Sequence, residues 1–128
     1  MTEASQEYPQ LPSLSIAALE LSASAAMDHK DYDAAIQFSK QAFERDPDFT
    51  SAGWLSGSLA AKYAQSGDPV YRKQAEDMIA QMQNRMRSDE EKLEFVNFSK
   101  RMQHRMDTRE IITRDEYNRR FGIVEAKR

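Results

Sequence analysis

The spacing of the apolar residues restricts the fold of this chain more than any other feature. From about residue 13 onward, apolar side chains recur three or four positions apart, and the alternation typical of a half-buried strand is essentially missing. The 128 residues include only 4 glycines and 4 prolines, too few for the many tight turns of a β-sandwich. The sequence therefore predicts an all-α fold, in a chain whose length suits one domain.

Short polar segments separate the expected helices and contain residues that start or stop a helix. We expect helices at about 14–29, 32–45 and 49–65, from Pro69 to about Met86, from Ser88 to about Met106, and at 114–121. Connections this short make consecutive helices antiparallel neighbours. We interpret residues 1–12 as a disordered N-terminal arm, 13–121 as a single helical domain and 122–128 as a charged C-terminal tail.

One segment carries a more specific pattern. A short turn leads into Tyr32, small residues follow at Ala35 and Ala42, and Asp46-Pro47 ends the unit. Small residues let two helices approach closely, and a proline stops a helix so that the next one can turn back. This arrangement resembles the second half of a tetratricopeptide (TPR) repeat.

The resemblance covers about residues 16–87. A second, more degenerate unit has Trp54 at the bulky position of its first helix and Ala75 at the first small position of its second helix. The implied architecture is a series of antiparallel helix-turn-helix repeats, a TPR-like α-solenoid of two repeats plus C-terminal capping helices. The alternative is a generic helical bundle in which the Asp-Pro turn is coincidental.

The resemblance also implies a function. TPR proteins as a class are not enzymes, and they bind a peptide or helix of another protein in a concave groove. The groove positions carried over to this chain lie on the first helix of each unit: Ala17, Glu20, Ser24, Met27, Ala52, Leu55, Leu59, Lys62 and Tyr63. Residues 13–29 lack the Lys, Arg and Asn with which one subtype clamps a C-terminal carboxylate. The resemblance therefore predicts an adaptor or chaperone-like module for an apolar or mildly basic segment.

Other roles stay open at this point. A structural subunit of a larger assembly would dock through the fifth expected helix, which has apolar residues on two sides, and through the C-terminal tail. Small bacterial secretion chaperones also use short TPR stacks, although this chain is short for that group. A homodimer is a further alternative, because a short stack has two ends that a second copy could cover.

No arrangement of residues typical of catalysis or metal binding is present in the sequence. Cysteine is absent, and each of the two histidines, His29 and His104, lacks a second ligand nearby in the sequence. We expect both histidines to face solvent. The acidic clusters at 31–33 and 89–91 precede or begin helices, where capping explains them. We therefore expect no enzymatic activity, no catalytic residue, no metal site and no cofactor.

The charge and hydropathy of the sequence indicate which classes of partner to expect. Residues 101–128 carry 8 basic and 5 acidic residues, and the interspersed acids dilute any field that would attract phosphates. We therefore expect no nucleic-acid partner. No apolar run approaches the roughly 20 residues of a membrane span, which argues against membrane insertion. The acidic, polar first residues do not resemble a secretory signal, so the expected location is cytoplasmic.

Overall fold

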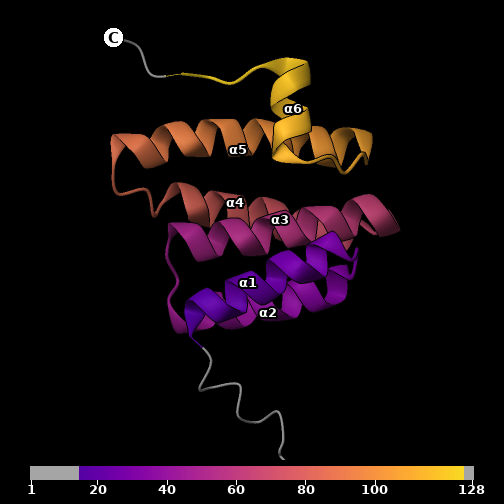
Figure 1. The fold of residues 1–128 in the computed structure, drawn as a ribbon, viewed down its shortest axis with the longest axis vertical. Coiled ribbons are helices and arrows are strands. Elements are labelled where there is room, and N and C mark those ends of the chain that lie inside the picture. The colour runs from indigo at the N-terminus through magenta and orange to yellow at the C-terminus, as the bar shows by residue number, and fades with distance from the viewer. Residues whose placement is uncertain (1–14, 126–128) are drawn as a thin grey trace, which may run out of the picture.

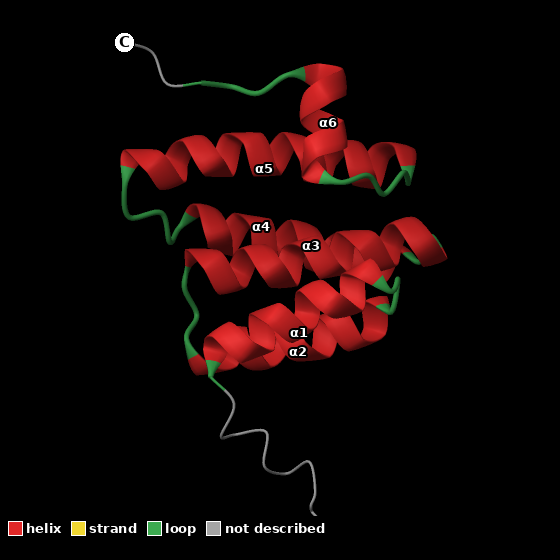
Figure 2. Cartoon of the chain, in the orientation of Figure 1, coloured by secondary structure: helices red, strands yellow, loops and turns green. Residues whose placement is uncertain are grey.

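The computed structural model describes residues 15–125, and every regular element in that range is a helix (Figures 1 and 2). The helices are α1 (Ile16–Asp28), α2 (Tyr32–Arg45), α3 (Phe49–Ser66), α4 (Pro69–Gln83), α5 (Asp89–Thr108) and α6 (Arg114–Phe121). The all-α prediction is confirmed. The predicted arm at 1–12 lies outside the described residues, as do the last three residues of the predicted tail.

Polar side chains fix the starts of the helices. The carboxylate of Asp31 accepts a hydrogen bond from the amide of Ala34 at 3.2 Å and begins α2. Asp48 accepts one from the amide of Ser51 at 2.8 Å, and the Ser51 hydroxyl accepts the Asp48 amide in return, which makes a complete capping box for α3. Each cap satisfies amides that the first turn leaves unpaired, so the loops stay short.

The helices pack in three tiers. Figure 1 shows α1 and α2 at one end, α3 and α4 in the middle, and α5 at the other end, with α6 crossing α5. α3 is the central helix and contacts α1, α2, α4 and α5. Methionines recur at helical spacing on α4 and α5, a pattern that suits a core or a partner-binding surface equally well; of these, Met86 is only partly buried. Met78, Met82, Met102 and Met106 are all buried in the core cluster.

Small residues bring α2 close to α3. Ala35 and Ala42 are fully buried, and so is Ser39 between them. The hydroxyl of Ser39 lies 3.2 Å from that of Ser58 on α3. Because neither hydroxyl reaches far from its own backbone, the hydrogen bond shows that α2 and α3 approach closely at this point.

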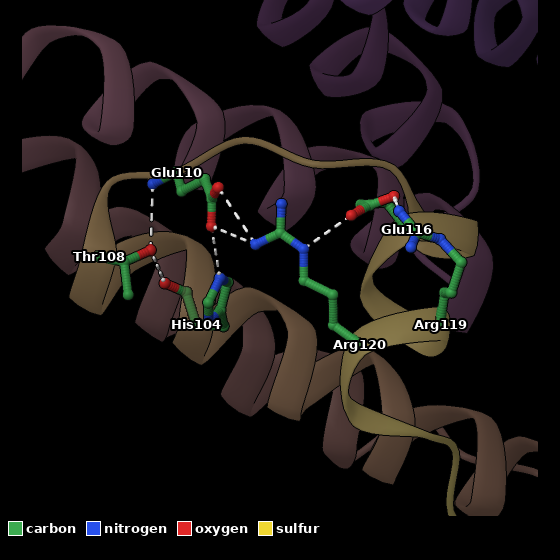
Figure 3. Close-up of polar contacts among 6 residues, drawn as sticks. All are labelled: His104, Thr108, Glu110, Glu116, Arg119 and Arg120. Atoms are coloured by element: carbon green, nitrogen blue, oxygen red, sulfur yellow. Dashed lines mark hydrogen bonds and ion pairs between the residues drawn. The ribbon is translucent and has the colours of Figure 1, made fainter.

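A polar network attaches α6 to the end of α5 (Figure 3). Glu110, in the connection, lies 3.1 Å from Nε2 of His104 on α5 and accepts a hydrogen bond from Nη1 of Arg120 on α6 at 3.1 Å. Nε of Arg120 also donates to Glu116 at 2.7 Å. The hydrogen bond to His104, followed by the charge of Arg120, lowers the pKa of Glu110, and the hydrogen bonds to Arg120 and Arg119 lower that of Glu116.

The prediction for His104 was wrong. Its ring does not face solvent but lies between α5 and α6, with its centroid 5.6 Å from that of Tyr117 and 5.1 Å from that of Phe121. The physical reason is that α6 is short and has no buried residue. Its two aromatic side chains, Tyr117 and Phe121, pack against the His104 ring instead. His29 is exposed, as expected.

Candidate functional site

A hollow of about 480 Å³ lies among α1, α3 and α5. Its base is the glycine face of α3, formed by Gly53 and Gly57 one helical turn apart. A Cβ atom placed on Gly57 would lie 4.0 Å from the Phe98 ring, and one placed on Gly53 would lie 3.3 Å from the Met82 methyl group. The missing side chain of Gly57 therefore leaves room at ordinary contact distance from Phe98, whereas Met82 fills the space beside Gly53.

The walls of the hollow are mainly apolar. They include Trp54 of α3, Phe98 and Met102 of α5, and Met27 of α1, with Met82 reaching in from α4. Thioether side chains are flexible and adapt to differently shaped ligands. A hollow with aromatic and thioether walls is suited to receive apolar side chains from another molecule.

Three arginines also line the hollow. Arg101 and Arg105 lie one turn apart on α5, and Arg114 begins α6. Arg105 is only 8% exposed, and burial lowers its pKa to about 10, with a further contribution from the charge of Arg101. Burial, together with the charge of Arg114, also lowers the pKa of Arg101. Two carboxylates, Asp28 and Glu94, line the same hollow, so its three arginines leave only a small positive excess.

The predicted groove residues of α1 divide into two groups. Ser24 and Met27 line the hollow. Ala17 and Glu20 do not, and Ala17 is exposed while Glu20 is half-buried. Burial raises the pKa of Glu20, and the nearby charges of Asp46 and Asp48 raise it further.

The predicted groove residues of α3 need correction. Ala52, Leu55 and Leu59 are buried in the core rather than lining this hollow, because the bulky stripe of α3 packs against α4. Leu55 and Leu59 instead border a separate, shallower depression on the side of α2 and α4. The opposite face of α3, with its two glycines, lines the hollow.

The last two predicted groove residues also make contacts outside the hollow. Nζ of Lys62 pairs with Asp33 of α2 at 3.1 Å and lies 5.8 Å from the ring centroid of Tyr71. The ring of Tyr63 packs against the core, with the guanidinium of Arg72 5.6 Å from its centroid. Both side chains are thus engaged in packing α3 against its neighbours.

The residues predicted to pack the repeats lie mostly in the interior. Tyr32 and Ala75 are buried, as are Ala35 and Ala42. Pro47 is exposed in the connection after α2, where its carbonyl accepts a hydrogen bond from Nε of Arg85 at 2.8 Å. Trp54 is half-buried, and it forms a wall of the hollow.

The arginines of the hollow are not among the site residues predicted from the sequence. A signal for them exists, because Arg101 and Arg105 interrupt the apolar face formed by Phe98, Met102 and Met106. A cation at a core-facing position is unusual enough to indicate either a buried partner or a ligand.

Comparison with known proteins adds no assignment: no family model matches the chain, and neither a curated protein nor a solved structure is significantly similar to it. Within residues 15–125, no group of three or more His, Asp or Glu side chains is placed to hold a metal ion. No helix in the same range is long and apolar enough to cross a bilayer. The function is therefore inferred from the geometry of the hollow.

Proposed function

We propose that this chain is a non-enzymatic protein-binding module, an adaptor or chaperone-like protein that receives a peptide or helix of a partner in the hollow. The observation that carries the proposal is the hollow itself, which the missing side chain of Gly57 leaves open between apolar walls. Such concave, mostly apolar sites with a few polar groups are typical of ligand binding.

The proposal includes the TPR-like architecture. Two antiparallel pairs, α1–α2 and α3–α4, would be the two repeats, with α5 and α6 as the cap. The buried small residues Ala35 and Ala42, and the end of α2 just before Asp46-Pro47, support this arrangement. In a stack of this kind the first helix of each unit faces the ligand, which matches the contributions of α1 and α3 to the hollow, and the capping helix α5 forms its third side.

Substitution of Gly57 tests the proposal. Gly57→Leu places a side chain in the hollow, its Cβ fits at ordinary contact distance, and leucine favours a helix more than glycine does. Peptides selected from a randomised display library on the full chain should bind Gly57→Leu at least about tenfold more weakly, a loss of roughly 1.4 kcal/mol. Ala80→Leu, on the exposed side of α4, is the matched control and should bind like the original protein. Failure to select peptides, or equal binding to both variants, would contradict the proposal.

A second candidate function, a structural subunit of a larger assembly, is favoured by one specific observation. Val96 of α5 is 39% exposed, Phe121 55%, and Ile123 and Val124 in the following segment 51% and 36%. Exposed apolar residues that gather on one side of a protein mark interaction surfaces. Under this alternative, Val96→Lys with Ile123→Lys would release the protein from a large native complex, whereas Gly57→Leu would leave it there. Size-exclusion chromatography of extracts would separate the two roles.

A further inference from the structure

Arg105 is the one charged side chain that is buried within the described part of the chain. Its Nη1 donates to the carbonyl of Gly57 at 3.3 Å and its Nη2 to the carbonyl of Ile112 at 3.2 Å. Its Nε is buried and has no hydrogen-bond partner. A buried cation is strongly unfavourable without a counter-charge, and a buried donor without an acceptor adds to that penalty. The fold therefore retains an incompletely satisfied cation beside an open hollow.

The other arginines of the hollow also lack a bonded carboxylate, and the charge of Glu94, which lines the same hollow, acts on Arg101 from a distance. Neither Arg101 nor Arg114 forms an ion pair with a carboxylate of residues 15–125, and Arg101 only lies with its guanidinium 5.3 Å from the centroid of Phe98. Outside the hollow, Arg72 pairs with Asp107 at 2.8 Å and Arg87 with Glu91 at 2.8 Å, whereas Arg85 and Arg109 donate to the carbonyls of Pro47 and Ala64. The hollow differs in bringing three arginines without a bonded carboxylate into one lining, and in burying one of them.

We infer that the hollow receives a carboxylate carried by the partner polypeptide, held by Nε of the buried Arg105 and by the guanidinium of Arg101. This inference rests on the proposed function and names the chemistry of the ligand that the same hollow takes. A carboxylate supplies both missing elements, an acceptor for the Nε proton and a negative charge between two guanidinium groups.

The surroundings of the two arginines specify what accompanies the carboxylate. Phe98 and Met102 share the face of α5 from which Arg101 and Arg105 project, and Trp54 lies in the facing wall. An apolar side chain beside the carboxylate would cover these residues. The ligand is therefore an acidic and apolar segment, which replaces the expectation of an apolar or mildly basic one.

A pair of small probes tests the subsite directly. N-acetyl-phenylalanine and its amide differ only in the carboxylate, and each is titrated into the ¹⁵N-labelled full chain while the arginine Nε–Hε signals are followed by NMR. The acid should shift and saturate the signals of Arg105 and Arg101, and the amide should not. A third probe, N-acetyl-glutamyl-phenylalanine amide, carries the carboxylate on a side chain, so the tighter of the two acids identifies the source. Equal responses to acid and amide would overturn the inference.

Substitutions separate binding from a purely structural role of the arginine. Arg105→Met keeps the length and the apolar volume, and binding of the acid should fall at least about tenfold because the charged hydrogen bond is lost. Arg101→Met, at a less buried position, should weaken binding without affecting the fold. Arg72→Met removes a guanidinium that pairs with Asp107 outside the hollow, and it should bind the acid normally. Unchanged affinity in both hollow variants would show that the arginines only support the fold.

The outcomes distinguish this inference from the function on which it rests. The selected peptides could bind the original protein more tightly than Gly57→Leu and yet contain no carboxylate. That result would support the protein-binding proposal and contradict the carboxylate subsite. Small acids that bind at Arg105, combined with failure to select any peptide, would contradict the protein-binding proposal while locating an anion site.

Discussion

The side-chain amide of Asn97 pairs with the main chain of Val124 through two hydrogen bonds. Nδ2 donates to the Val124 carbonyl at 2.8 Å, and the Val124 amide donates to Oδ1 at 2.7 Å. Nδ2 also donates to the carbonyl of Leu93 at 3.2 Å, which fixes the orientation of the side chain on α5. A single residue thus holds the segment after α6 against α5.

Asn97→Ala should release this segment without unfolding the domain. The Val124 amide loses its acceptor, so its hydrogen-exchange rate should rise to that of an unprotected amide. The free energy of unfolding should change by less than about 1 kcal/mol, because solvent can replace the lost hydrogen bonds at this exposed site. NMR-detected exchange and thermal melting measure the two effects, and continued protection of Val124 would contradict the assigned pairing.

Replacing Met102 or Val96 on α5 by alanine should change the free energy of unfolding by very different amounts. Met102 is 1% exposed and belongs to the core cluster, so Met102→Ala should reduce the free energy of unfolding by roughly 2–5 kcal/mol. Val96 is 39% exposed, and Val96→Ala on the same helix should change it by about 0.5 kcal/mol or less. Urea denaturation of both variants measures the contrast, and equal losses would mean that the exposed face of α5 is also packed.

The helices were predictable because their signals are local. α2 begins after Asp31 and ends just before Asp46-Pro47, and α4 begins at Pro69 with Asp68 as its cap, both as the sequence indicates. These residues act through their own turn of backbone, so no knowledge of distant contacts is needed.

The face of α3 that lines the hollow was not predictable in the same way. A stripe containing Leu55 and Leu59 fits a core or a groove equally well, and only the position of α4 decides that it is core. The hollow is instead lined by Gly53 and Gly57, which carry no hydrophobic signal. Its charge comes from Arg105, more than forty residues away in the sequence, and only tertiary packing brings it opposite Gly57.

Glu20 should destabilise the protein at neutral pH. Its pKa is raised by burial and by the charges of Asp48 and Asp46, so the folded state binds a proton more tightly than the unfolded state does. The contribution of Glu20 to the free energy of unfolding therefore falls as the pH rises through 4.5, the ordinary pKa of this side chain, and above. Glu20→Gln should stabilise the protein at pH 7 by less than about 1 kcal/mol, since solvent screens the group. Melting at pH 7 and pH 4 checks this, because the advantage should shrink at the lower pH.

The attachment of α6 should weaken in acid. Bonds to His104 and Arg120 lower the pKa of Glu110, and bonds to Arg120 and Arg119 lower that of Glu116. The stabilisation is complete above the ordinary pKa of 4.5 and is lost as the pH falls through the lowered values. Amide exchange in α6, followed from pH 6 downward, should accelerate before exchange in α3 does. Glu110→Gln should show faster α6 exchange already at pH 6, and simultaneous loss of α6 and α3 would argue against a separately attached helix.

Gly67 ends α3 with a backbone φ of +74°, a conformation in which any side chain is strained. A side chain at this position would also collide with a neighbouring arginine. A Cβ atom would lie 2.9 Å from Nη2 of Arg109, whose Nε donates to the carbonyl of Ala64 at 3.2 Å. Gly67→Ala should therefore combine left-handed strain, worth about 1–2 kcal/mol, with displacement of the arginine. Replacing Arg109 by alanine removes the obstacle and leaves the strain alone. Urea denaturation should show that Gly67→Ala costs less stability in the Arg109→Ala background than in the original protein. Equal losses in the two backgrounds would show that Arg109 moves aside freely.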